Sequence, residues 1–212
     1  MTCLWLPRTA AIAVLLSAFL AGCAGLAPTS TVTTTGGGTA AAAERDGPFA
    51  RVYTCPDGFR FSARAGVDAT RLDLGTRLLT LARAPADSGA RFTDGETLLR
   101  TRGGEATLEV DASIRSGCRG RDAADPWQAA ALRGVDLRAL GQEPGWTAEV
   151  VAGEWLRVLQ AGQGGVLVAR DPARERADAD TTAYTGSAGG ERLRLRVTES
   201  ACTDSMSGES FP

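Results

Sequence analysis

The fold class follows from residues 51–63, RVYTCPDGFRFSA. Apolar and polar side chains alternate on both sides of a short segment, Cys55-Pro56-Asp57-Gly58, whose composition is typical of a tight turn. Alternation with a period of two is the pattern of a strand that has one buried face. These residues therefore predict a β-hairpin.

Further short strands are predicted on either side of this hairpin. Residues 77–81 (RLLTL) and 106–110 (ATLEV) have the same character, and Gly and Asp residues punctuate the chain from about residue 48 to residue 119. Strands that recur at roughly 8–12 residue spacing are typical of small antiparallel barrels and sandwiches. We predict an all-β fold, with the first unit a small antiparallel β-barrel over residues 48–119.

Residues 88–95, SGARFTDG, lie between two of these strands and carry chemistry suited to contact. They combine small residues and an Asp-Gly pair with one hydroxyl, one guanidinium and one aromatic ring. We expect an exposed loop that the sheet holds out at one edge.

A second small β-rich domain is predicted over residues 120–212. A linker from Gly120 to about Ala131 leads into a short helix around residues 127–132, and strand-like runs follow at residues 148–151, 155–159, 166–169 and 193–197. The length of 212 residues suits two domains of ~100 residues each.

The N-terminus has the pattern of a targeting segment. Arg8 precedes an apolar run over residues 10–21 that is short for a membrane-spanning helix. Residues 20–23, LAGC, resemble the bacterial lipobox, in which a signal peptidase cuts before the Cys and the thiol receives lipid (palmitate). Residues 1–22 are then a lipoprotein signal peptide and Cys23 is the lipidation site; a plain secretory signal with an incidental Cys is the alternative.

Residues 23–47 predict a flexible tether, because they are mostly Ala, Thr, Gly, Ser and Pro. Ala24 stands where the lipoprotein resemblance places an Asp in proteins retained at the inner membrane. The resemblance therefore implies an outer-membrane protein, lipid-anchored and facing the periplasm.

The composition argues against an enzyme. The chain has no His, and all 23 basic residues are Arg, so His-based triads and His-ligated zinc sites are excluded. Asp171, Asp178 and Asp180 lack the spacing of an EF-hand loop. A hydrolase with a carboxylate pair drawn from residues 94, 96 and 105 is an alternative, but no pocket motif accompanies these residues. We expect no cofactor, no metal and no nucleic-acid partner.

Three Cys residues remain when those of the signal and the lipidation site are set aside: Cys55, Cys118 and Cys202. Cys55 and Cys118 lie at the two ends of the first unit, so a disulfide between them would tie its first strand to its last. Export to an oxidising compartment favours this bridge. Two free thiols are the alternative.

Four segments resemble the membrane-bound and periplasmic inhibitors of c-type lysozyme: Tyr53-Thr54-Cys55, residues 88–95, residues 102–108 (RGGEATL) and Cys118. The resemblance implies a small antiparallel barrel whose Ser-Gly-Ala loop enters the lysozyme cleft, with c-type lysozyme as the partner. It also implies a lysozyme-binding set, which comprises Ser88, Gly89, Ala90, Arg91, Phe92, Thr93, Asp94 and Arg102.

Two residues and the charge depart from the family pattern. Arg102 stands where the family usually has Lys, and Arg100 stands at a usual Trp position. From Gly47 to Arg119 the chain has eleven Arg against nine Asp or Glu, a difference of two, so the unit is slightly cationic. Since c-type lysozymes are cationic too, long-range steering would not favour the encounter.

The second unit resembles an uncharacterised lipoprotein domain of bacterial envelopes, through residues 133–136 (RGVD), 141–146 (GQEPGW) and 202–209 (CTDSMSGE). Glu143 and Trp146 suggest either a ligand site or, for Trp146, a core position. In the resembling domain the chain continues past Phe-Pro to another Cys. The resemblance therefore indicates either a C-terminally truncated sequence or an unpaired Cys202. The function predicted is inhibition of lysozyme; a non-inhibitory structural or ligand-binding lipoprotein of the envelope is the alternative.

Overall fold

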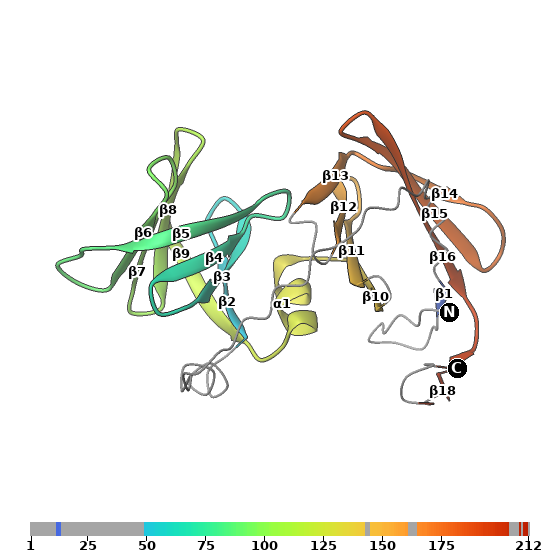
Figure 1. Ribbon diagram of the computed structural model, residues 1–212, viewed down its shortest axis with the longest axis horizontal. Helices are drawn as coiled ribbons and strands as arrows, with labels where there is room; N and C mark the ends of the chain where they lie inside the picture. The colour runs from blue at the N-terminus through green and yellow to red at the C-terminus, as the bar shows by residue number, and fades with distance from the viewer. Residues whose placement is uncertain are drawn as a thin grey trace, which may run out of the picture.

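The first unit is a closed barrel of eight antiparallel strands (Figure 1). In the computed structural model, the described residues are 12–13, 49–142, 145–160, 165–203, 208 and 210–211. The barrel strands are β2 (Ala50–Thr54), β3 (Arg60–Ala65), β4 (Ala69–Asp73), β5 (Leu78–Ala84), β6 (Ala90–Thr93), β7 (Leu98–Arg102), β8 (Glu105–Val110) and β9 (Ser113–Ala123). The all-β prediction is confirmed, and the hairpin predicted from residues 51–63 is β2–β3.

The barrel closes because β9 pairs with both β8 and β2. Its interior is filled by side chains that alternate along the strands, and five large ones are fully buried: Phe61, Leu72, Leu81, Leu99 and Leu108. Full burial of one such side chain stabilises a fold by about 1.5–3 kcal/mol. When the sheet closes, the inward-facing side chains of the strands therefore form one common core.

A disulfide joins Cys55, directly after β2, to Cys118 in β9, with their Cα atoms 3.9 Å apart. The predicted bridge is confirmed. It ties the first strand of the barrel to the last across a sequence separation of 63 residues, at the seam where β2 and β9 pair.

The helix α1 (Pro126–Arg133) begins and ends where local signals predict. The Asp125 carboxylate accepts hydrogen bonds from the backbone N–H groups of Trp127 and Gln128, Pro126 occupies the first turn, and Gly134 ends the helix in the left-handed conformation. The buried Ala129 packs with Ala50, Val52 and Ala123 against the outside of the barrel. The expected linker from Gly120 is wrong at its start, because residues 120–123 belong to β9 and pair with β2.

The second unit consists of two antiparallel sheets that share one core. The first sheet contains β10 (Leu137–Gln142), β11 (Gly145–Val151), β12 (Trp155–Gln160) and β13 (Val166–Arg170). The second contains β14 (Ala173–Arg176), β15 (Thr181–Ala188) and β16 (Glu191–Glu199). Leu156 and Val150 from the first sheet and Leu195 from the second are buried together. Trp146 packs against the same cluster, which confirms its prediction as a core residue.

Three two-residue strands complete the described elements. β1 (Ile12–Ala13) pairs with β16, and β17 (Cys202–Thr203) pairs with β18 (Ser210–Phe211). Within the described residues, none of the helices has both the length and the apolar character that a membrane crossing requires. The tether, Glu143 and the lipidation site Cys23 lie outside the described residues.

Candidate functional site

Two turns meet at one end of the barrel. Because β6 pairs with β7 in a register that places Ala90 opposite Thr101, Ser88 and Gly89 lie beside Arg102. Gly89 has a φ of +72°, and a Cβ built on it would lie 2.1 Å from the Thr101 carbonyl oxygen. The same Cβ would lie 3.2 Å from the Arg102 Cβ. A residue without a side chain is therefore required for the two turns to touch.

The turn that carries Arg102 is a tight hairpin between β7 and β8. Gly103 and Gly104 have φ of +58° and +90°, and Arg102 pairs with Glu105 across them. Two central residues with positive φ are the requirement of a type I′ turn, which Gly-Gly meets. The Gly104 carbonyl accepts a hydrogen bond from the Gly120 N–H at 2.8 Å, so β9 also holds the turn in place. Ser88 and Arg102 are both exposed on this support.

The remainder of residues 88–95 does not form one exposed loop, and that expectation is wrong. Residues 90–93 are strand β6, and Phe92 is 5% exposed, so its ring belongs to the barrel core. The Arg83 guanidinium lies 5.7 Å from the centre of that ring. Successive side chains of a strand point to opposite faces, so Phe92 points inward while its two neighbours point outward.

The Asp-Gly pair lies at the opposite end of β6 from Ser88. The Asp94 carboxylate accepts the backbone N–H groups of Glu96 and Thr97 at 3.1 and 2.7 Å, and Thr93 Oγ1 donates to the Thr97 carbonyl at 2.7 Å. These bonds form the β6–β7 turn. Of the expected lysozyme-binding set, the structure brings together Ser88, Gly89, Ala90 and Arg102, and it places Thr93 and Asp94 elsewhere.

Two further arginines lie on the strands behind the paired turns. Arg91 and Arg100 are direct cross-strand partners on β6 and β7. Arg100 is exposed and forms an ion pair with Glu109 at 2.9 Å, whereas the Nε of half-buried Arg91 has no hydrogen-bond partner among the described residues. Arg100 therefore faces solvent, whereas the adjacent Leu99 is buried in the barrel core.

This end of the barrel has chemistry suited to carboxyl groups. A hydroxyl can donate to a carboxylate or accept from a carboxylic acid, and a guanidinium can pair with a carboxylate through two parallel N–H groups. Ser88 and Arg102 stand on neighbouring turns, each held by backbone contacts. Arg91 adds local positive charge, whereas the charge of Arg100 is balanced by Glu109.

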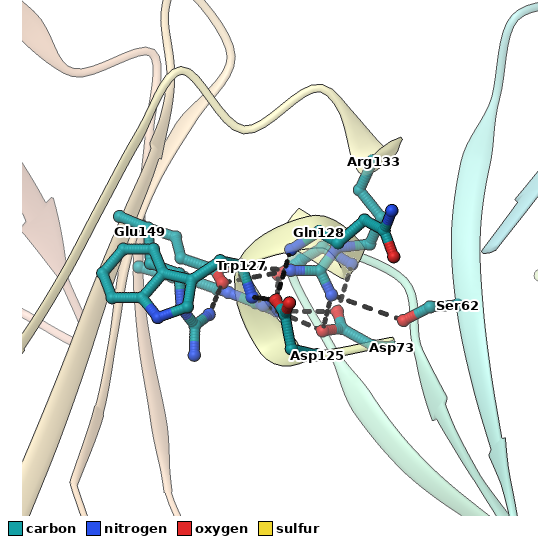
Figure 2. A network of polar contacts seen from close by, with 10 residues as sticks. Ser62, Asp73, Asp125, Trp127, Gln128, Arg133 and Glu149 are labelled. Carbon is teal, nitrogen blue, oxygen red and sulfur yellow. Dashed lines mark hydrogen bonds and ion pairs between the residues drawn. The ribbon is translucent and has the colours of Figure 1, made fainter. Parts of the chain in front are cut away.

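A second feature, not predicted from the sequence, is a buried ionic cluster between the two units (Figure 2). It contains Asp73 from β4, Arg133 from α1, Arg138 from β10, Glu149 from β11 and Arg157 from β12. Glu149 and Arg157 face each other across β11 and β12 and are 0% and 2% exposed. The signal in the sequence is a charged residue within each of two apolar strands, AEVV and LRVL.

The cluster is held by charge-assisted hydrogen bonds. Arg157 donates to the two Asp73 carboxylate oxygens at 2.7 and 2.8 Å and to the Gly75 carbonyl at 2.7 Å. Arg133 donates to the two Glu149 oxygens at 3.1 and 2.8 Å and also pairs with Asp73, and Arg138 pairs with Glu149. One carboxylate from the barrel and one from the second unit thus share the same arginines.

The surroundings shift the pKa values of three members. Burial by itself would raise the pKa of Asp73, but the hydrogen bonds and charge of Arg157 and the charge of Arg133 lower it. Burial would lower the pKa of Arg157, but Asp73 and Glu149 raise it. Burial lowers the pKa of Arg138, and the charges of Arg133 and Arg157 act in the same direction against the opposing effect of Glu149.

Comparison with known families finds one similarity, and it lies in the barrel. Residues 53–115 match the family described as membrane-bound lysozyme-inhibitor of c-type lysozyme. The match covers most of the barrel and includes both paired turns, so it supports a lysozyme-inhibitor role for this unit. No match was found among curated proteins or among solved structures.

Proposed function

We propose that this chain inhibits c-type lysozyme by inserting the loop that ends at Ser88 and Gly89 into the enzyme's cleft. Ser88 and Arg102 contact the two catalytic carboxyl groups, one protonated and one ionised in enzymes of this class. The observation that carries the proposal is the juxtaposition of the two turns, with Gly89 against the Thr101 carbonyl. The family match over residues 53–115 supports it.

Arg91, on β6 behind the turns, extends the proposed contact with positive charge. A cleft that carries acidic groups attracts this local charge, although the barrel and a cationic lysozyme repel each other at long range. We therefore expect that close contacts supply the affinity and that long-range electrostatic attraction raises the association rate little. Phe92 and Asp94 support the site by packing and by turn formation.

The test is a titration of c-type lysozyme activity with the protein and its single variants. Stoichiometric inhibition is expected, and Ser88→Ala and Arg102→Ala are expected to weaken it by about tenfold or more, which corresponds to about 1.4 kcal/mol or more for a lost charge-assisted hydrogen bond. Arg-to-Lys replacement at residue 102 is expected to retain part of the effect, because the charge remains but the planar fork is lost.

Ser113→Ala and Arg192→Ala are matched controls, since both residues are exposed and Ser113 lies at the other end of β8. They are expected to inhibit as the parent does. Absence of inhibition by the parent protein, or equal loss in the control variants, would refute the proposed site.

The proposal includes attachment to the outer membrane through a lipid on Cys23. The lipobox-like residues 20–23 and the tether composition of residues 23–47 support it. Incorporation of a labelled fatty acid is expected for the parent and absent for Cys23→Ser. Label retained in Cys23→Ser would exclude this anchor.

A different role, as a ligand-binding lipoprotein of the envelope, is favoured by one observation, the cavity beside the ionic cluster between the barrel and the second unit. If purified protein leaves lysozyme fully active yet binds a small molecule in that cavity, this second role replaces the first.

A further inference from the structure

A cavity of about 560 Å³ lies between the barrel and the second unit, beside the ionic cluster. Its volume is in the range of small-molecule sites, roughly 300–1,000 Å³. Strands β2, β3, β4, β5, β10, β11, β12 and β13 and the helix α1 contribute its walls. It is separate from the proposed inhibitor site: Asp73 pairs with Leu78 at the start of β5, whereas the loop that carries Ser88 follows the end of β5.

The cavity is lined by apolar and by cationic side chains. Leu79, Leu159 and Val166 are among the apolar lining residues. The charged lining residues are Arg64, Arg71, the cluster arginines Arg133, Arg138 and Arg157, and Asp73. A ligand that fills this cavity would therefore meet both hydrocarbon and guanidinium groups.

The cluster contains more positive charge than its own acids balance. Its three arginines face two carboxylates, Asp73 and Glu149, which leaves one excess positive charge. A cluster that serves only to join two units is expected to contain as many carboxylates as arginines, because an uncompensated buried charge is costly. An added monoanion would balance the cluster.

The same arginines hold unused hydrogen-bond donors. The Nε atoms of Arg133, Arg138 and Arg157 are buried and have no hydrogen-bond partner within the described residues. The Arg157 and Arg133 side chains are only 2% and 7% exposed, so bulk solvent has little access to them. Buried donors on cations without acceptors are rare, because burial removes their water partners as well. These unpaired donors add to the incompletely compensated positive charge of the cluster beside the cavity.

These observations limit the ligand. Inorganic phosphate has no hydrocarbon body to meet the apolar walls, whereas a planar carboxylate matches the guanidinium geometry and can carry such a body. The apolar walls require a hydrocarbon body. We propose that this cavity binds a small monocarboxylate with an aliphatic part, such as a medium-chain fatty acid or the C-terminus of a short apolar peptide.

Calorimetric titration of the whole protein tests the proposal with octanoate and N-acetylleucine, which represent the two sources of the same chemistry. Saturable one-to-one binding of at least one of them is expected, together with a rise in the unfolding midpoint. Octanamide, which has the same shape without the charge, is expected to bind at least tenfold more weakly. Inorganic phosphate is expected to bind at least tenfold more weakly as well.

Two variants test whether the ligand binds in this cavity. Arg138→Gln removes the most accessible cluster arginine, and Val166→Trp fills the apolar side without touching the cluster; each is expected to weaken binding at least tenfold. Arg174→Gln, on exposed β14, is the matched control and is expected to bind as the parent does. If Arg138→Gln fails to fold, Val166→Trp decides.

The proposal is overturned if neither carboxylate binds, if octanamide or phosphate binds as tightly as the carboxylates, or if Val166→Trp binds unchanged. Lysozyme inhibition, measured on the same samples, is expected to be intact in Val166→Trp, because the inhibitor turns lie at the other end of β5.

Discussion

The backbone at Gly89 leaves no space for a side chain, and this one position controls the geometry of the proposed inhibitor site. Gly89→Ala combines a φ of +72° with a Cβ 2.1 Å from the Thr101 oxygen. We predict that this variant separates the two turns and weakens lysozyme inhibition by at least tenfold. An inhibition titration and a urea unfolding curve check it.

Gly95→Ala is the matched control, because Gly95 also has a positive φ, +99°, but a Cβ there meets nothing within 4 Å. Its backbone strain is expected to cost about 1–2 kcal/mol of folding free energy, with inhibition intact. If both variants lose inhibition equally, general backbone strain explains the effect and contact between the turns does not.

Segment 88–95 shows for which residues the sequence predicts exposure or burial correctly and for which it does not. The small and polar character of Ser88 and Gly89 predicts exposure correctly, since such residues favour turns for local reasons. The expected exposure of Phe92 is wrong, because the same local sequence is compatible with a strand that turns the ring inward or outward. Only the phase of β6 in the closed barrel decides the direction.

At the scale of elements, the strands with strong alternation and the capped helix were predictable, and weakly patterned strands were not. Helix α1 has an Asp cap, an early Pro and a terminal Gly, which are all local signals. Strand β15, TTAYTGSA, has one large apolar side chain and an internal Gly, and it is a strand because β14 and β16 pair with both of its edges. Tertiary pairing overrides propensity in such segments.

The disulfide at the β2–β9 seam supports a prediction on stability. Cys55→Ala/Cys118→Ala is expected to lose about 4 kcal/mol of unfolding free energy, from the loop-entropy relation for residues 63 apart in sequence. Urea unfolding of the parent with and without reductant, beside the double variant, measures it. Reductant should shift the parent curve toward the variant and leave the variant unchanged; a loss below about 1 kcal/mol would show that strand pairing alone closes the barrel.

At the scale of the whole molecule, Asp73 links the barrel to arginines of α1 and the second unit. Asp73→Asn removes one of the two carboxylates that Arg157 and Arg133 share, so that both guanidinium groups are left with Glu149 alone among the cluster acids. Such a change typically costs about 3–5 kcal/mol. Asp57→Asn, at an exposed carboxylate paired with Arg115, is the control and is expected to leave the unfolding midpoint nearly unchanged.

The same carboxylate predicts an acid dependence. The pKa of Asp73 is lower in the folded protein than its ordinary value, so its stabilisation is fully present above the unfolded pKa of about 3.9 and is lost as the pH falls through the folded value. Unfolding curves from pH 7 to pH 3 should therefore show a smaller loss for Asp73→Asn than for the parent. Equal losses would mean that other acids control acid unfolding.

The sequence by itself determined the β class, the first hairpin, the cap and stop of α1, the Cys pair and the turn character of Ser88 and Arg102. Each of these features depends either on residues that are close together in the chain or on a residue type, such as Cys, that has few possible partners. The tertiary structure alone decided which face of β6 is interior, which turns touch, and that Asp73 meets Arg157 from 84 residues away. Closure of the barrel and docking of the second unit select these contacts, and local sequence patterns carry no information on partners so distant.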